Sequence, residues 1–286
     1  MQKVTRKTLT IKPSGRSTDY LSPTIIMGCG FECSYCYCKR HKTKGVDIAD
    51  NLGDILTEIN SHVYFSDVEK PNQTHPEYIT YDIGCNSDMA LHAKHYDWQR
   101  IFKFFRDHPL AMGSFATKYV NPKLLEFNPN QKVRIRFSLM PEKMRKIVEP
   151  NTSTIQERLD AVIKFQDAGY DVHLNFSPVI VYDGWLDDYQ ELFEQVNNTM
   201  LRDGWRPDVK AEVIFLTHNE GKHLYNVEHQ LPGEEFLWTP DIQENKTSQY
   251  GGENIRYKHD LKHTYQQKFV DLHNKTISWC TIRYIF

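Results

Sequence analysis

The sequence contains no apolar stretch long enough to cross a membrane. A membrane-spanning helix needs about 18 or more consecutive apolar residues, whereas the longest candidate, residues 174–182, has only the length of a strand. Residues 1–10 are polar and mildly basic, and they lack the apolar core of a signal peptide. We therefore expect a cytoplasmic protein that has no membrane partner.

The chain also lacks a large excess of charge of either sign. Its 286 residues carry a formal net charge of −2, with 40% hydrophobic and 25% charged residues, which excludes disorder as the dominant state. A nearly neutral chain has no global electrostatic attraction to nucleic acid. Local basic clusters are present, although a solvated surface is the more common explanation of each. They are Lys39, Arg40, His41, Lys42 and Lys44; Lys132, Arg134 and Arg136; and Lys143, Arg145 and Lys146.

Short apolar runs alternate regularly with segments of helical spacing. Period-two patterns indicate strands, and apolar positions three or four apart indicate helices. The expected strands are 23–27, 78–83, 113–117, 133–139, 172–181 and 211–216, and the expected helices are 48–63, 98–105, 122–127, 154–168 and 188–200. This alternation predicts an α/β fold with a parallel sheet and helices outside it. The number of units favours an open or partial (β/α)6 TIM-like barrel over the complete eight-unit barrel.

The pattern gives no sign of a domain boundary or an internal repeat. We predict a single domain over residues 1–286, with its core at about 20–218 and a C-terminal hairpin and cap at about 219–286. Residues 230–252 contain several prolines and glycines and indicate a long loop or hairpin. A polar surface helix at 257–275 and an apolar strand at 281–286 are expected to follow.

Cysteine usage is the most informative feature. Four of the six cysteines, Cys29, Cys33, Cys36 and Cys38, fall within ten residues, and in a reducing compartment this clustering indicates a metal rather than disulfides. The first three can hold three irons of a [4Fe–4S] cluster and leave the fourth iron open for a cofactor or substrate. A zinc knuckle that adds Cys38 is the alternative, but structural zinc sites usually take ligand pairs from separate segments.

The spacing of these cysteines, with Tyr35 before Cys36 and an expected strand before Cys29, resembles the radical S-adenosylmethionine superfamily. The resemblance implies that the open iron binds the amino and carboxylate groups of S-adenosylmethionine. It also implies reductive cleavage of this cofactor to methionine and a 5′-deoxyadenosyl radical. The expected cofactors are therefore a [4Fe–4S] cluster and S-adenosylmethionine, and the expected electron donor is a protein such as flavodoxin or ferredoxin.

Further segments, between about residue 24 and residue 286, resemble the spore photoproduct lyase family. They are Cys33-Ser34-Tyr35-Cys36-Tyr37, Cys85-Asn86-Ser87-Asp88, Ala116-Thr117-Lys118-Tyr119, Arg134-Ile135-Arg136-Phe137-Ser138, Glu149-Pro150-Asn151-Thr152-Ser153, Ala168-Gly169-Tyr170 and Asp183-Gly184-Trp185. Each segment alone is a weak signal, but together and in this order they are specific. The resemblance implies a lyase that restores two thymines from a methylene-bridged thymine dimer, with lesion-containing DNA as its partner.

The same resemblance implies roles for three residues in hydrogen transfer. Cys85 would give a hydrogen atom to the thymine methyl radical, because the S–H bond is weak. A lone cysteine is more often a small buried apolar residue, but Cys85 follows an expected strand at the edge where barrel active sites gather. One or both of Tyr35 and Tyr37 would return the resulting thiyl radical to the cofactor, although packing around the cluster is the alternative for at least one of them.

Lys118 stands at the end of another expected strand, at the same edge of the sheet. An ammonium group there can pair with the carboxylate of S-adenosylmethionine. The family resemblance supports this role, and it also implies cofactor contacts from Ser87 and Ser138. A surface lysine is the alternative explanation for Lys118.

DNA contacts are expected at two places. Arg134 and Arg136 share one face of a strand, where they either line the barrel or meet phosphate. In the family, an arginine and a tyrosine on a late hairpin wedge into DNA beside the lesion. The corresponding residues here are Gln249 and Tyr250, and Tyr250 could stack on a base or fill the gap left by a flipped dinucleotide.

Two other functions remain open. The glutamine at position 249 and the short segment before Cys29 motivate a radical isomerase or modifying enzyme that acts on another thymine-derived base in DNA or a nucleotide. A non-catalytic iron–sulfur or zinc module that only binds nucleic acid is the third reading, but such a module has no need of Cys85 or Lys118. We expect the protein to be a monomer.

Overall fold

The computed structural model describes residues 1–286 except 39–43, 66–68, 202–206 and 248–250. The chain divides into two compact units. The first unit comprises Met1–Gly30, Cys38–Phe137 and Ala161–His173, and the second comprises Phe31–Tyr37, Ser138–Asp160 and Leu174–Phe286. Each unit is described separately below, and the prediction of a single domain stays a prediction.

The first unit is built on a mostly parallel sheet in the order β2-β3-β6-β7-β8. Its strands are β2 (Lys12–Pro13), β3 (Tyr20–Leu21), β6 (Ile79–Asp82), β7 (Ala111–Thr117) and β8 (Val133–Leu139). Strands β3, β6, β7 and β8 run parallel, and β2 is antiparallel to β3. All seven residues of β8 are buried, as expected for a parallel strand covered on both faces. The predicted bounds of this strand, 133–139, are confirmed.

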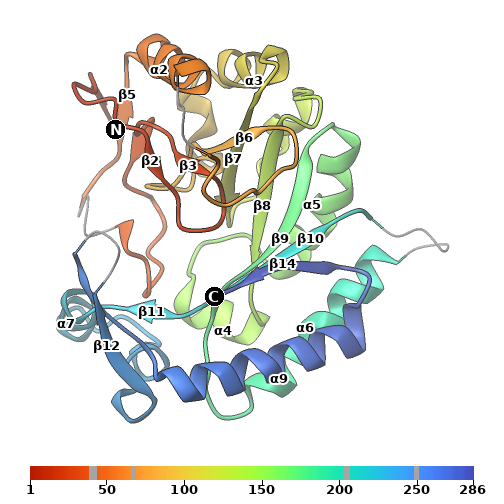
Figure 1. Cartoon of the computed structure of the whole chain (residues 1–286). Coiled ribbons are helices and arrows are strands. Elements are labelled where there is room, and N and C mark those ends of the chain that lie inside the picture. Colours follow the sequence, from red (N-terminus) through yellow and green to blue (C-terminus); the bar gives the residue numbers. More distant parts are fainter. Residues whose placement is uncertain (39–43, 66–68, 202–206, 248–250) are drawn as a thin grey trace. The chain divides into compact units, whose positions relative to one another are not determined.

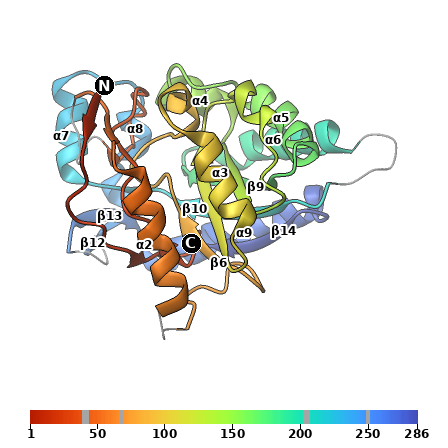
Figure 2. The same ribbon diagram turned by 90° about the horizontal axis from the view of Figure 1, so that it is seen from above.

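Two helices of this unit, α2 (Leu52–Phe65) and α3 (Trp98–Asp107), lie side by side in both ribbon views (Figures 1 and 2). The buried residues of α2 are Ile55, Leu56, Ile59 and Val63, which repeat at the spacing of one helix face. Helix α3 begins at the N-cap Asp97, whose carboxylate accepts a hydrogen bond from the Arg100 amide. Helix α5 (Ile155–Asp167) belongs to this unit from Ala161 onward.

The apolar run at 23–27 contributes to a different sheet from the one expected. Its strand β4 (Ile26–Met27) pairs antiparallel with β5 (Asp47–Ala49), which pairs parallel with β1 (Gln2–Val4). The first parallel strand of the main sheet is instead β3, whose Tyr20 is opposite Tyr81 of β6. An apolar run indicates a buried strand, but it does not say which partner completes its hydrogen bonds.

The second unit contains the strands β9 (Asp171–Val179, from Leu174 onward), β10 (Lys210–Phe215) and β14 (Thr281–Ile285). Strands β10 and β14 run parallel. Helices α6 (Trp185–Met200) and α9 (His259–Ile277) pack against each other, as Figure 1 shows. Phe269 of α9 is fully buried and its ring contacts those of Tyr189 and Phe193 of α6. The predicted polar helix therefore has one apolar face.

The C-terminal part of the second unit contains the predicted hairpin. Strands β12 (Gln243–Thr247) and β13 (Glu253–Tyr257) are antiparallel, and β13 also pairs with β11 (Thr217–His218). Helices α7 (Glu220–Glu228) and α8 (Glu234–Leu237) precede the hairpin, and α4 (Glu142–Val148) follows β8. The sequence analysis did not foresee these three helices.

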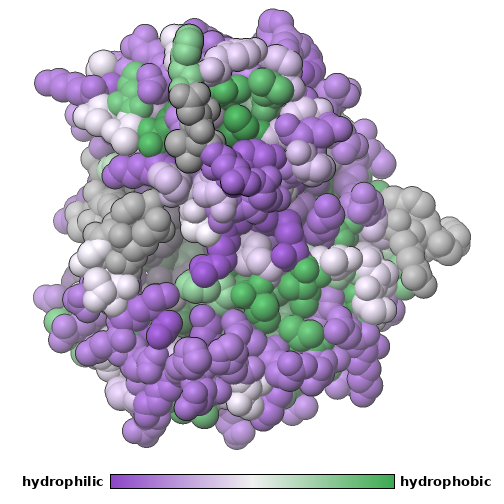
Figure 3. Space-filling view, in the orientation of Figure 1, coloured by the Kyte–Doolittle hydropathy of each residue, from purple (hydrophilic) through white to green (hydrophobic). Residues whose placement is uncertain are grey.

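The main sheet has eight strands in the order β14-β10-β9-β8-β7-β6-β3-β2, and β8 and β9 are each divided between the two units. Its first and last strands are not paired with each other, so the described sheet is open, as the partial-barrel prediction requires. Within the described ranges, no helix is both long enough and apolar enough to span a bilayer. The face in Figure 3 is mostly hydrophilic, with separate apolar patches.

Candidate functional site

The cysteine loop begins where β4 ends. Gly28 has a φ of +94°, which favours glycine, and its amide donates to the Asn86 carbonyl at 3.0 Å within the first unit. In the second unit, the Cys36 amide donates to the Cys33 carbonyl at 3.0 Å, so a tight turn joins these two cysteines. Among the described residues, no three His, Cys, Asp or Glu side chains lie close enough together to hold a metal ion. The ligand set of Cys29, Cys33 and Cys36 therefore remains a prediction from spacing.

Ser34 fixes the loop between the second and third cysteines. Its amide donates to the Val148 carbonyl at 3.0 Å, and its hydroxyl donates to the Pro232 carbonyl at 2.9 Å. The side-chain amide of Asn226, on α7, donates to the Ser34 carbonyl at 2.8 Å. All polar groups of Ser34 are thus hydrogen-bonded inside the second unit, which restricts the motion of this turn.

The two tyrosines beside Cys36 have different surroundings. The Tyr35 hydroxyl donates a hydrogen bond to Glu149, and burial together with the negative charge of Glu149 raises the Tyr35 pKa well above its usual value. Tyr35 is therefore a phenol whose hydrogen is directed at a carboxylate. Tyr37 is 48% exposed. The sequence assigned both residues to the same relay, and the structure distinguishes them.

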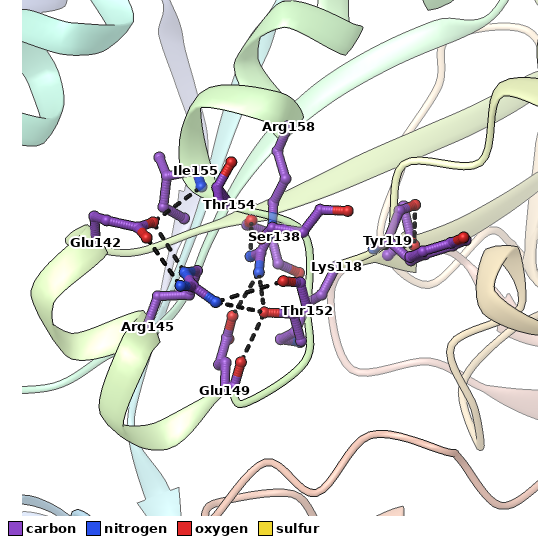
Figure 4. A network of polar contacts seen from close by, with 12 residues as sticks. Lys118, Tyr119, Ser138, Glu142, Arg145, Glu149, Thr152, Thr154, Ile155 and Arg158 are labelled. Carbon is purple, nitrogen blue, oxygen red and sulfur yellow. Dashed lines mark hydrogen bonds and ion pairs between the residues drawn. The ribbon is translucent and has the colours of Figure 1, made fainter.

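Glu149 belongs to a buried network centred on Arg158 (Figure 4). The two side chains form an ion pair at 2.9 Å, and both are fully buried. Arg158 also donates to the Ser138 carbonyl at 2.7 Å and to the Thr152 hydroxyl at 2.7 Å. A buried charge pair needs such additional hydrogen bonds to offset its desolvation. The segment 149–153 therefore has a structural function: it holds both Tyr35 and the end of β8.

Ser138 itself is buried, and its hydroxyl accepts a hydrogen bond from Asn175 at 3.3 Å. This contact lies within the second unit and orients the side chain. The predicted contact of Ser138 with the cofactor stays a prediction.

Cys85 follows β6 in the first unit, after a turn that needs glycine. A Cβ at Gly84 would lie 2.9 Å from the Cβ of Phe115, so only glycine fits there. Burial raises the pKa of the Cys85 thiol to about 12, and the nearby Asp82 carboxylate contributes in the same direction. The side chain therefore keeps its proton at physiological pH, which is the form that can donate a hydrogen atom.

Asp88 holds the end of β7 against the loop that follows β6. Its carboxylate accepts hydrogen bonds from the Lys118 amide at 2.7 Å, the Thr117 hydroxyl at 2.8 Å and the Leu91 amide at 3.2 Å. Burial raises its pKa, whereas these three donors oppose that shift. Asp88 therefore determines the position of Lys118, a role that the sequence analysis did not assign.

Three buried polar atoms in the same loop have no hydrogen-bond partner among the described residues: Ser87 Oγ, His92 Nε2 and Tyr96 Oη. An unsatisfied buried polar group costs about 1–3 kcal/mol, and native structures contain few of them. Three such atoms lie between residues 87 and 96, which indicates that this segment binds a cofactor or another non-protein group. These polar atoms, which all lie in the first unit, suit contact with a polar cofactor.

Comparison with known proteins identifies the family. The model of the family described as spore photoproduct lyase matches residues 3–286. The chain belongs to the spore photoproduct lyase family. The spore photoproduct lyase of Bacillus subtilis (strain 168) is 27% identical over 268 residues, which cover 92% of this chain and 75% of that protein. The spore photoproduct lyase of Clostridium acetobutylicum is 24% identical over 286 residues, which cover 98% of this chain and 80% of that protein.

Solved structures of spore photoproduct lyase share the fold. A mutant with dinucleoside spore photoproduct superposes with a TM-score of 0.86 at 22% identity and covers 100% of this chain and 81% of its own. A double mutant with bound AdoMet and dinucleoside spore photoproduct has the same TM-score and identity, and the match covers 82% of that chain. The α/β fold predicted from the sequence is thus the fold of this family.

Among the predicted DNA contacts, Arg134 and Arg136 lie in the described residues, whereas Gln249 and Tyr250 fall in the range 248–250. Arg136 is 4% exposed and forms an ion pair with Asp82 at 2.6 Å. Its neighbour Arg134 is also buried and pairs with Asp171 at 2.6 Å. The expectation of a solvated basic face on this strand is therefore wrong: each arginine is matched to a carboxylate inside the first unit. Contact of Arg136 with DNA stays a prediction.

Proposed function

We propose that this member of the spore photoproduct lyase family repairs spore photoproduct in DNA and restores two thymines. The observation that carries the proposal is the thiol of Cys85, which is kept protonated by burial at the end of β6. Relatives with the same fold were solved with dinucleoside spore photoproduct and with AdoMet. A nucleic-acid module without catalytic activity has no need of Cys85 or of Lys118.

Cys29, Cys33 and Cys36 would hold the [4Fe–4S] cluster, and S-adenosylmethionine would complete the coordination of its open iron. Together these groups supply a primary carbon radical that abstracts hydrogen from carbon 6 of the lesion. Lys118, placed by Asp88, would pair with the cofactor carboxylate, since an ammonium and a carboxylate form a strong charge-assisted hydrogen bond. The Ser87 hydroxyl has no partner among the described residues and is therefore available for a cofactor contact.

Cys85 would complete the repair. When the bridging bond of the lesion breaks, a radical remains on the methyl carbon of one thymine. The S–H bond of Cys85 breaks and a C–H bond forms, so the thymine is restored and a thiyl radical remains on sulfur. A hydrogen atom from a tyrosine O–H would restore the thiol and leave a phenoxyl radical. That radical would regain its O–H bond by taking a hydrogen atom from a C–H bond of 5′-deoxyadenosine, which would again become the carbon radical.

Of the two tyrosines, we assign this relay to Tyr37, because the Tyr35 hydroxyl is committed to Glu149. Replacing Tyr37 by phenylalanine is expected to abolish repeated turnover, so that S-adenosylmethionine is consumed stoichiometrically with repaired lesion. The matched variant Tyr35→Phe loses a structural hydrogen bond but should still turn over. The measurement is the ratio of 5′-deoxyadenosine to thymine; an increase only in Tyr35→Phe would contradict the assignment.

The proposed function is tested by an anaerobic assay of the iron-reconstituted protein with S-adenosylmethionine, dithionite and a spore-photoproduct dinucleotide. Chromatography should detect thymine and 5′-deoxyadenosine, and the Cys33→Ala control should bind less iron and form neither product. If 5′-deoxyadenosine forms without thymine, the result contradicts repair of spore photoproduct and favours modification of another thymine-derived base. If the iron-loaded protein forms neither product, this result contradicts an enzymatic function.

We infer that the partner is lesion-containing DNA, since relatives bind its dinucleoside form. A flavodoxin or ferredoxin as electron donor, a monomeric state and a cytoplasmic location remain predictions from the sequence.

A further inference from the structure

The segment after Asp88 packs against the cysteine loop inside the first unit. A Cβ built on Gly30 would lie 3.6 Å from Cε1 and 4.0 Å from Nε2 of His92, and 3.3 Å from Leu91. The edge of the imidazole ring therefore rests on the residue directly after Cys29. A Cβ at position 30 would therefore make ordinary contact with His92 and a tight contact with the end of the Leu91 side chain.

The polar edge of His92 has no protein partner. Its Nε2 atom is buried and has no hydrogen-bond partner among the described residues, and the whole residue is only 7% exposed. Native proteins rarely leave a buried nitrogen unsatisfied. The atom accordingly needs a hydrogen-bond partner that the described chain does not supply.

Tyr96, four residues later, presents a second buried donor to the same region. Its hydroxyl is also buried without a hydrogen-bond partner among the described residues. Burial is the largest cause of its raised pKa, followed by the negative charges of Asp88 and Cys29. Tyr96 directly follows the short helix Ala90–His95, which carries His92. One short connection between β6 and α3 thus provides two unsatisfied groups, and the first of them lies against Gly30, the residue after Cys29.

We propose that His92 and Tyr96 are hydrogen-bond donors to the sulfur atoms on the Cys29 side of the iron–sulfur cluster. This inference rests on the proposed function, which supplies the cluster. Thiolate and sulfide sulfurs accept such bonds, and hydrogen bonds to sulfur change the reduction potential of a cluster. A donor stabilises the more negative, reduced state more than the oxidised state, so the two residues raise the potential and make the cluster easier to reduce.

The test is a redox titration of the reconstituted full-length protein, followed by electron paramagnetic resonance, without S-adenosylmethionine. His92→Phe and Tyr96→Phe should each lower the midpoint potential, because each removes one donor. His95→Phe is the matched control, since His95 is an exposed histidine on the same short helix, Ala90–His95, and its potential should equal that of the wild type. In deuterated water, the coupling of an exchangeable deuteron to the reduced cluster should be lost in at least one of the first two variants.

An unchanged midpoint potential and unchanged deuteron coupling in both variants, at wild-type iron content, would overturn the proposal. If His92→Phe fails to bind iron, Tyr96→Phe decides alone, because it removes a single oxygen atom: a lowered potential supports the proposal and an unchanged one overturns it. If the wild-type protein itself binds no cluster, the proposed function fails as well. That result is distinguishable, because it appears as absent iron before any variant is compared.

Discussion

Replacing Cys85 by alanine is expected to lower the yield of correctly repaired thymine to a small fraction of the wild-type yield, because the group that donates the hydrogen atom is removed. Formation of 5′-deoxyadenosine should continue, because radical generation does not require the thiol. The thymine methyl radical then has no S–H donor and is trapped in by-products. Chromatography of the dinucleotide products would detect both effects.

Two further cysteine variants sharpen this test. Cys85→Ser keeps nearly the same size but should also fail, since an alcohol O–H bond is much stronger than a thiol S–H bond. Cys280→Ala removes another buried thiol, whose pKa is likewise raised to about 12 by burial, and it should repair normally. Clean repair by Cys85→Ala, without by-products, would rule out the donor role.

The raised pKa of Cys85 predicts the pH dependence of the same reaction. An ordinary thiol ionises near pH 8.5, whereas Cys85 keeps its proton until the pH approaches about 12. The repair rate should therefore show no decrease with an ordinary thiol pKa. The free energy of unfolding, in contrast, should decrease as the pH rises. Above the thiol pKa of the unfolded chain, the unfolded state loses the Cys85 proton while the folded state keeps it, and this difference favours unfolding.

Replacing Glu149 by glutamine is expected to lower the free energy of unfolding by about 3–5 kcal/mol, the cost of breaking one partner of a buried ion pair. Arg158 would remain fully buried without its carboxylate. Tyr35 would also exchange a charged acceptor for a neutral one. Thermal unfolding should therefore begin several degrees lower than in the wild type.

Matched variants separate lost pairing from a general effect of the substitution. Glu191→Gln changes an exposed residue and should shift stability by no more than about 0.5 kcal/mol. The double variant Glu149→Leu with Arg158→Met removes both charges and should be more stable than Glu149→Gln, since apolar replacements of a buried pair are often neutral or better. A Glu149→Gln protein that unfolds at the wild-type temperature would show that the pair contributes little.

Several features of the fold follow from local sequence alone. Strand 133–139 has the same bounds in the structure as in the sequence analysis, because its apolar residues repeat every second position over the whole strand. Helix α9 lies within two residues of the expected 257–275, and β12 lies inside the expected hairpin segment 230–252, whereas β13 follows that segment. The small sheet containing β4 could not be predicted, because strand pairing depends on hydrogen bonds between segments far apart in the chain.

The roles of individual site residues divide in the same way. Sequence spacing indicated Cys29, Cys33 and Cys36 as a ligand set and Cys85 as a lone thiol after a strand, since these signals are local. Tyr35 and its acceptor Glu149 are 114 residues apart, and no periodicity connects them. Asp88 and Glu149 stood in segments that carried the family resemblance, but their functions became visible only through the groups that they hold.

The sequence by itself determined the α/β class and the family, and it predicted the chemical types of the site: thiols for a cluster, a thiol for hydrogen transfer and an ammonium for a carboxylate. The tertiary structure decided which of these groups is buried, paired or exposed. It buries Arg136 against Asp82, 54 residues away, and commits Tyr35 to Glu149 while Tyr37 stays exposed. The physical reason is that residue type and spacing are properties of the chain, whereas desolvation and pairing depend on segments that only folding brings together.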